Sequence, residues 1–312
     1  MKTRQIDETV ECTRQGFRRS LNLLFVLAAG CIAAQTAQAG PTPGSHDETL
    51  MHAGVQRQYR LHVPTRYNPN QAVPLVLMLH GRGGNGRGFE QLTGMSEIAD
   101  KGDFVVAYPY ALGKPPAWTT GFNDAIHNGD DIGFLKALIN KLETTCKIDP
   151  HRIYCAGFSS GAMMSEVVGA KLSEKVAAIA VVEGCIGAEQ NGQLHTVPDP
   201  VDPVSLIQFH GKMDQTVPYN GGPNPHLPNG VVLPVSKSID FWVHEDGCNT
   251  TPSTQLLDNG TIHRDDYVGG KKGTEVVLFT MDHGQHKWPT PALIGISATN
   301  HIWTFFKNHP KQ

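Results

Sequence analysis

The feature that most constrains the fold of this chain is a series of short, mostly apolar runs that show no polar alternation. They lie at residues 75–79, 104–107, 153–156, 177–182 and 206–209. A strand with one solvated face alternates with a period of two, whereas unbroken apolar runs are typical of parallel strands buried on both faces. The sequence therefore predicts a buried parallel sheet.

Helical patterns separate these runs. Apolar residues recur at three- and four-residue spacing over residues 135–142 and 239–243, and Gly247 is a stop signal after the second pattern. A further strand is predicted at residues 276–280 and a helix at residues 297–307. Strands that alternate with helices imply right-handed crossovers. We therefore predict an α/β fold with a mostly parallel, doubly wound sheet flanked by helices.

Two segments are expected to depart from this pattern. Residues 55–63 alternate with a period of two, with Val55 on the apolar side, which predicts an outer antiparallel strand. Residues 218–234 are rich in proline, glycine and asparagine, and we predict a long loop there rather than a domain boundary.

The N-terminal segment, residues 1–39, has the pattern of an export signal. Arginines precede the apolar run 21–29, and small residues at 37–39 form a cleavage pattern. The run is shorter than an ordinary membrane span. We expect a secreted or periplasmic protein, with a lipid anchor at Cys31 as the alternative to soluble release. Residues 40–312 are then predicted to form one domain.

Four of the six cysteines would remain after removal of this signal, namely Cys146, Cys155, Cys185 and Cys248. An even number of thiols in an oxidising compartment predicts disulfide bonds, and four cysteines allow three pairings. The alternative for Cys155, which lies within an apolar run, is that it is simply a small buried residue.

Composition narrows the class of partner. The chain has 312 residues, of which 18% are charged, and a formal net charge of −3. Scattered lysines and arginines give no basic patch for nucleic acid. The histidines lack the paired spacing of a metal site, and the glycine-rich segment 80–86 lacks the spacing of a nucleotide-binding loop. We expect no metal, no cofactor, no nucleic acid and no stable membrane span, and the oligomeric state stays open.

The sharpest local motif is Gly157-Phe158-Ser159-Ser160-Gly161. It follows a predicted strand and precedes a helical pattern that begins near Met163. This strand-to-helix context is that of a nucleophile elbow, in which glycines two positions before and after the serine relieve crowding in a strained turn. Ser159 is therefore a candidate nucleophile of an α/β-hydrolase fold.

A serine hydroxyl needs a base to accept its proton and a carboxylate to orient that base. In this fold the acid and then the base follow the serine along the chain. Asp214 lies just after the apolar run 206–209, and two histidines, His283 and His286, follow the strand predicted at 276–280. Spacing alone leaves both histidines open as the base.

Two other histidines, His80 and His210, precede the candidate acid, so we expect structural roles for them. Ester cleavage also needs hydrogen-bond donors for the oxyanion that forms on the carbonyl. The glycine-rich segment 80–86 follows a predicted strand, and its backbone can supply the amide of Arg82. The amide of Ser160, directly after the nucleophile, is the second candidate donor.

Taken together, the motifs resemble those of the secreted poly(3-hydroxybutyrate) depolymerase and feruloyl esterase group, which is related to carbohydrate esterase family one. The resemblance spans most of residues 55–312. Its segments, in family order, are 79–81, 130–134, 149–154, 157–161, 210–214, 217–219 and 286–289.

The resemblance assigns roles that spacing leaves open. It places the catalytic histidine directly before a residue followed by Trp-Pro, which selects His286 over His283. It also implies that Trp288 and Trp118 stand near the acyl or aromatic part of a substrate, with ordinary core packing as the alternative. The sequence departs from the family pattern at Gln285, and it lacks a cysteine expected near Gly270.

The activity implied is a serine carboxylic-ester hydrolase that forms an acyl-enzyme on Ser159. A small or oligomeric ester is the expected partner, with hydroxyalkanoate oligomers or related esters as substrate. A feruloyl or acetylxylan esterase is the main alternative. A non-catalytic binding protein on a hydrolase scaffold is a more remote one, because fold alone does not establish function.

Overall fold

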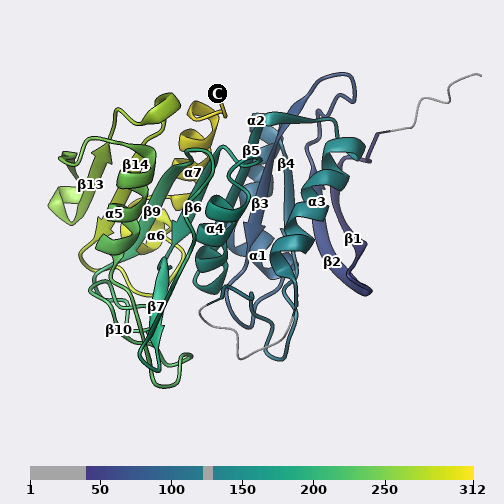
Figure 1. The fold of residues 1–312 in the computed structure, drawn as a ribbon. Coiled ribbons are helices and arrows are strands. Elements are labelled where there is room, and N and C mark those ends of the chain that lie inside the picture. The colour runs from purple at the N-terminus through teal and green to yellow at the C-terminus, as the bar shows by residue number, and fades with distance from the viewer. Residues whose placement is uncertain (1–39, 122–128) are drawn as a thin grey trace, which may run out of the picture. The chain divides into compact units, whose positions relative to one another are not determined.

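A ten-stranded sheet forms the centre of the computed structural model, which describes residues 40–121 and 129–312 (Figure 1). In spatial order, the parallel strands are β4 (Val105–Pro109), β3 (Val73–Leu79), β5 (Ile148–Phe158), β6 (Ala178–Val182), β9 (Ser205–Gly211) and β14 (Val276–Met281). Antiparallel strands extend both edges: β2 (Val55–Val63) and β1 (Gly44–His52) beyond β4, and β13 (Ile262–Tyr267) and β12 (Ser253–Leu257) beyond β14. The predicted parallel sheet is confirmed.

Helices cover both faces of the sheet (Figure 1). On one face α1 (Gly86–Thr93), α2 (Met95–Gly102) and α7 (Ala298–Asn308) pack in a core that contains Phe89, Met95 and Phe306. On the other face α3 (Asp131–Thr145), α4 (Ser160–Lys171) and α5 (Val235–Asp246) form the second core. The doubly wound architecture predicted from the apolar runs is therefore confirmed, and all side chains of β3 and β9 are buried.

The order of the strands creates a crevice at one edge of the sheet. The chain runs from β3 to β4 on one side and then returns past β3 to β5 on the other. Connections that leave neighbouring strands in opposite directions open a crevice at the carboxyl ends of those strands. Two candidate segments, the glycine-rich loop after β3 and the serine motif after β5, therefore begin at this point.

The predicted antiparallel strand at residues 55–63 is confirmed as β2, but two details near the edges differ from expectation. Val55 is 44% exposed because it pairs with His52 beside the β1–β2 turn, although the rest of the apolar side of β2 is buried. Residues 218–234 contain β10 (Gly222–Pro223) and β11 (Gly230–Val232), which join β7 (Gly187–Gln190) and β8 (Gln193–Thr196) in a second sheet. Strands this short show no measurable apolar period.

The predicted disulfide bonds are also wrong for the four cysteines in question. Cys146, Cys155, Cys185 and Cys248 are all free and buried. Each thiol has its own polar neighbour. The Sγ atom of Cys155, for example, lies 3.5 Å from Ser165 Oγ. Burial raises the pKa of Cys155 to about 12, which keeps the thiol protonated. The alternative interpretation of Cys155, as a small residue of a core strand, is confirmed.

The predicted signal peptide and Cys31 lie outside the described residues. Residues Gly40–Gln312 form one compact unit. Within the part of the chain that the structure describes, no helix is both long and apolar enough to cross a membrane.

A buried ion pair joins the edge strand β2 to helix α3. Arg57 Nη2 lies 2.6 Å from Asp131 Oδ1, and both side chains are almost fully buried. The second carboxylate oxygen of Asp131 accepts the backbone N–H of Thr119 at 2.8 Å, and the guanidinium of Arg57 lies 4.0 Å from the centre of the Phe134 ring. The Asp131 carboxylate on α3 therefore connects this helix to β2 and to the segment that contains Thr119.

We predict that Asp131→Ala lowers the free energy of unfolding by about 3 kcal/mol, because it leaves a buried guanidinium without its counter-charge. Denaturant titration measures this loss. The matched control is Arg66→Ala, which removes an exposed arginine paired with Asp103 and is expected to cost less than about 1 kcal/mol. Equal losses in the two variants would contradict the prediction.

Candidate active site

Ser159 occupies the sharp turn between β5 and α4. Its backbone has φ 55° and ψ −120°, which is strained for a residue with a side chain. A Cβ added to Gly157 would lie 2.1 Å from the carbonyl oxygen of Gly161, and one added to Gly161 would lie 2.1 Å from that of Leu79. Both glycines are therefore required for α4 to pack this closely on β5 and β3.

Hydrogen bonds link Ser159 to His286 and Asp214 at the carboxyl ends of the strands. His286 Nε2 lies 2.9 Å from Ser159 Oγ, and His286 Nδ1 lies 2.7 Å from Asp214 Oδ2. Asp214 is in the loop after β9, and His286 is in the loop after β14. The structure thus brings together the three residues that the sequence singles out, although they are far apart along the chain.

The surroundings of Asp214 keep its carboxylate ionised and fixed. Its side chain is fully buried, and Oδ1 accepts the backbone N–H groups of Thr216 at 2.7 Å and Val217 at 2.8 Å. Burial by itself would raise the pKa of Asp214. The hydrogen bond and charge of His286, with smaller contributions from Glu183 and the Val217 amide, outweigh burial and lower that pKa. The anion can therefore hold His286 in the tautomer that faces the serine.

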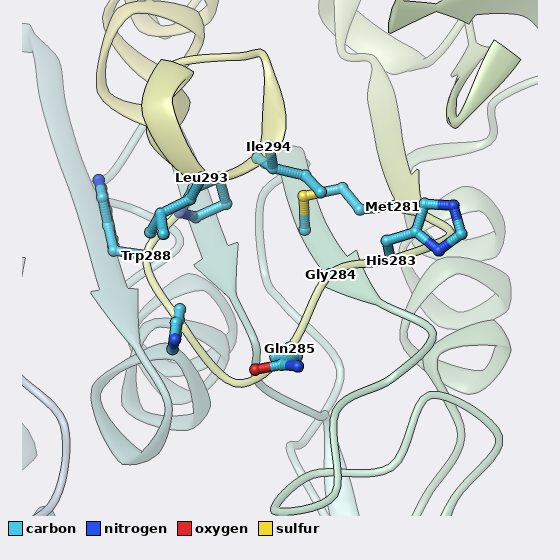
Figure 2. A pocket seen from close by; sticks show the side chains of 9 residues that line it. Met281, His283, Gly284, Gln285, Trp288, Leu293 and Ile294 are labelled. Carbon is cyan, nitrogen blue, oxygen red and sulfur yellow. The ribbon is translucent and has the colours of Figure 1, made fainter. Parts of the chain in front are cut away.

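The second candidate base, His283, does not reach the serine. Its side chain is exposed on the outer side of the loop after β14 and lines a different cavity from the one beside Ser159 (Figure 2). The structure therefore brings His286, and not His283, to Ser159. Residue 285, where the sequence departs from the family's glycine run, is also on the exposed surface.

The loop after β3 lies against the serine. A Cβ added to Gly81 would lie 3.3 Å from Ser159 Cβ, so only glycine fits here without a shift of its neighbours. Arg82 is the next residue, and Ser160 is the first residue of α4. The first amides of a helix lack acceptors within the helix and favour negative charge. Both candidate oxyanion donors are thus on segments that border Ser159.

The two histidines that precede the acid in the chain stabilise loops, as predicted. His80 Nε2 accepts the backbone N–H of Ala111 at 3.1 Å, and His80 Nδ1 lies 2.8 Å from the carbonyl oxygen of Gly81. His210 Nε2 lies 2.8 Å from the carbonyl oxygen of Val217. Burial lowers the pKa of both, to about 4 for His210, so both rings are neutral near pH 7.

Trp118 and Trp288, expected beside the substrate, are both buried in the structure. Trp118 Nε1 donates to the carbonyl oxygen of His80 at 2.8 Å, and Trp288 Nε1 donates to Thr299 Oγ1 at 3.1 Å. Only 1% and 2% of their surfaces are exposed, respectively. This burial favours the alternative of core packing for both rings, although Trp288 also lines a cavity at the loop after β14.

Two cavities lie close to the segments that carry the site residues. One of about 200 Å³ lies between the loop after β14 and α6 (Pro291–Ile294), with Met281 and Trp288 in its lining (Figure 2). The other, of about 250 Å³, lies along the glycine-rich loop and Phe158, the residue directly before Ser159. It is lined by His80, Gly81, Arg82, Gly84, Asn85, Gly88, Phe89, Leu92 and Phe158.

The cavity beside the serine, which we call the acyl cavity, has an apolar wall that no sequence pattern marks. Phe89 and Leu92 come from α1, and Phe158 directly precedes Ser159. The Phe158 ring also lies 5.0 Å from the His286 ring. Only the placement of Phe158 in the serine motif could have indicated one of these residues, because apolar positions on α1 resemble any buried helix face.

The side chain of one cationic residue, Arg82, lines the acyl cavity. Among the described residues, no carboxylate lies within 4.0 Å of that side chain. Burial lowers the pKa of His226, and the charges of Arg82 and His286 lower it further, so the His226 ring is neutral near pH 7. The charge of Arg82 therefore favours an anionic group on a ligand.

Among the described residues, one group of side chains has the spacing of a metal site. Atoms of Glu183, His210 and Asp214 that could bind an ion lie within 4.8 Å of one another. Yet His210 Nε2 already faces the Val217 carbonyl and Asp214 already accepts three hydrogen bonds. These residues fit a hydrogen-bond network better than a cation, and the predicted absence of a metal stays a prediction.

Comparison with known proteins agrees with the geometry. The chain matches the family "Esterase PHB depolymerase" over residues 58–213, which include Ser159 and end one residue before Asp214. It is 26% identical over 272 residues to "Putative esterase NocK" of Nocardia uniformis subsp. tsuyamanensis, covering 78% of this chain and 75% of that protein. It is 27% identical over 229 residues to feruloyl esterase B of Piromyces equi, covering 72% of this chain and only 41% of that protein.

A solved structure supports the fold. The acetyl xylan esterase from Aspergillus awamori superposes with a TM-score of 0.58 at 14% identity, covering 84% of this chain and 99% of that one. The chain therefore belongs to the esterase PHB depolymerase family, and it is a carboxylic-ester hydrolase of the α/β-hydrolase fold.

Proposed function

We propose that the protein is an exported serine esterase that forms an acyl-enzyme on Ser159 and acts on hydroxyalkanoate oligomers or related esters. The observation that carries the proposal is the hydrogen-bonded line from Ser159 through His286 to Asp214. Export rests on the signal pattern of residues 1–39.

The proposed mechanism uses each residue at a defined atom. His286 Nε2 accepts the proton of Ser159 Oγ as that oxygen attacks the ester carbonyl, and Asp214 stabilises the imidazolium that forms. The backbone amides of Arg82 and Ser160 stabilise the oxyanion. His286 then gives its proton to the leaving alcohol, and water, activated by the same imidazole, releases the acid and restores the serine.

The acyl cavity supports the proposed substrate class. Its wall of Phe89, Leu92 and Phe158 suits short alkyl groups, and its volume of about 250 Å³ suits one or two small monomer units rather than a bulky lipid. The Arg82 side chain in its lining suits the terminal carboxylate of a linear hydroxyacid oligomer.

A second candidate is the hydrolysis of feruloyl or acetyl esters of polysaccharides. The named feruloyl esterase among its relatives and the phenylalanines of the acyl cavity favour it, since an aromatic acyl group can pack on these rings. The binding-protein alternative has less support, because a strained serine turn with an aligned base and acid is costly to maintain without catalysis.

We predict that Ser159→Ala reduces the release of p-nitrophenol from a short-chain ester by at least about 10³-fold, because no other hydroxyl can replace the nucleophile. Steady-state assays of purified protein measure the loss. The wild-type protein should also release a burst of p-nitrophenol that matches the enzyme concentration if deacylation is slow. Equal rates in variant and wild type would support the binding-protein alternative.

Replacing each histidine of the loop after β14 tests the assignment of the base. His286→Ala should lose activity about as severely as Ser159→Ala, since the residues act as a unit. His283→Ala is the matched control on the exposed side of the loop and should retain most of the activity. The opposite result would refute the role of His286.

A substrate panel separates the two candidate functions. We expect kcat/KM for hydroxybutyrate oligomers to exceed that for methyl ferulate and acetylated xylan by at least about tenfold, or 1.4 kcal/mol in transition-state binding. Arg82→Ala should raise KM for the carboxylate-ended oligomer several-fold and leave a neutral p-nitrophenyl ester unaffected. Arg87→Ala, whose side chain pairs with Asp47, is the control. A preference for ferulate would favour the second candidate.

A further inference from the structure

A second buried acid, Glu183, lies next to the proposed catalytic acid. Glu183 directly follows β6, and its backbone has φ 51°, which is strained for a residue with a side chain. Its side chain is completely buried, and both of its oxygens lie 3.1 Å from the backbone nitrogen of Gly211. The mechanism above does not use this carboxyl group.

The Glu183 and Asp214 carboxyl groups share one buried cluster with His210, in which oxygen and nitrogen atoms of the three side chains lie within 4.8 Å of one another. Two carboxyl groups this close in a buried site cannot both be ionised, so one of them must carry a proton. Among the described residues, the other titratable groups that face this pair are His210 beside it, His286 beyond Asp214 and the protonated thiol of Cys185 near Asp214. The state of these two rings decides which carboxyl is the anion.

His210 does not supply a counter-charge for Glu183. Its Nε2 lies 3.5 Å from Glu183 Oε2, but it lies 2.8 Å from the carbonyl oxygen of Val217, which is the better acceptor by distance. Among the described residues, Nδ1 of His210 has no hydrogen-bond partner, as expected of a neutral ring that carries its proton on Nε2. The ring therefore offers Glu183 no positive charge.

Asp214, in contrast, is well suited to be the anion. It accepts two backbone N–H groups and the His286 ring, whereas Glu183 shares a single backbone N–H between its oxygens. Burial, together with the hydrogen bond and charge of Asp214, raises the pKa of Glu183 well above its usual value. The shared proton thus belongs to Glu183.

We propose that Glu183 is a positioning residue of the active site: a neutral carboxylic acid whose O–H donates to Asp214 and keeps that carboxylate aligned with His286. The same carboxyl group accepts the backbone N–H of Gly211 at the end of β9, and this bond holds Glu183 in place. This inference rests on the catalytic roles proposed above for Asp214 and His286.

The test uses two substitutions with different consequences. Glu183→Gln keeps a donor for Asp214 and an acceptor for Gly211 without any ionisable proton, so kcat/KM near pH 7 should stay within about threefold of wild type. Glu183→Ala removes the donor and should lower kcat by at least about tenfold. Thermal unfolding of both variants shows whether the alanine variant is folded, and the glutamine variant keeps the test valid if it is not.

The acid limb of the pH profile of kcat/KM supplies a readout that a merely structural role would not move. This limb reports protonation of the base in the free enzyme. If Glu183 is neutral, Glu183→Gln leaves the limb within about 0.3 pH unit of wild type. A limb displaced to lower pH by more than this would mean that the substitution removed a negative charge, and it would overturn the proposal, as would equal losses of activity in the two variants.

Infrared difference spectra test the protonation state without any assay of activity. Wild type minus Glu183→Gln at neutral pH should show the C=O band of a protonated carboxyl group, and a carboxylate band in its place would refute the proposal.

The control for the pH profile is Glu166→Gln, which alters a buried acid bonded to Trp242 and should leave the acid limb in place. An active Ser159→Ala variant would refute the proposed function. The infrared spectra would still test the protonation state of Glu183 independently of activity.

Discussion

The close approach of β3, β5 and α4 at the Ser159 turn is the constraint on which the active site depends. Glycines at positions 157 and 161 allow backbone atoms to pack where any side chain would collide. The turn holds Ser159 in a strained conformation, and the surrounding sheet supplies the stability that such strain requires. Because β9 and β14 belong to the same sheet, their following loops bring Asp214 and His286 to the same edge.

The buried polar groups around Asp214 form a connected set rather than isolated groups. Asp214 contacts His286 on one side and the Glu183 carboxyl on the other, and His210 is bonded to the loop that also supplies amides to Asp214. A buried polar group without a partner would lower the stability of the fold, whereas a connected network favours a single arrangement of these side chains. The proposed positioning of His286 thus involves buried residues that have no contact with Ser159 Oγ themselves.

Much of this could be predicted from the sequence, for identifiable reasons. The parallel strands have unbroken apolar runs, which are typical of strands buried on both faces. Ser159 lies in a motif whose glycines relieve steric crowding. Asp214 and His286 follow from chain order and, for His286, from the family resemblance, while the structure adds their contacts. The short strands near residues 187–196 and 222–232 have too few residues for a period, so no pattern indicates them.

The side chains that depend on tertiary packing could not be predicted in the same way. The family resemblance implies a role beside the substrate for Trp118 and Trp288, but only the packed structure shows that both rings are buried. Phe89 and Leu92 line the acyl cavity together with Phe158, which is distant in the sequence, and no local pattern indicates that they lie close together. Glu183 follows an ordinary core strand, and only its contact with Asp214 distinguishes it.

The separate burial of four thiols has a consequence for how the protein can be made. Cys146, Cys155, Cys185 and Cys248 are unlinked and enclosed by their own neighbours, so the described domain reaches its fold without any oxidative step. Its folding therefore does not depend on the redox potential of the compartment. A reducing compartment is as suitable a place to produce the domain as an oxidising one.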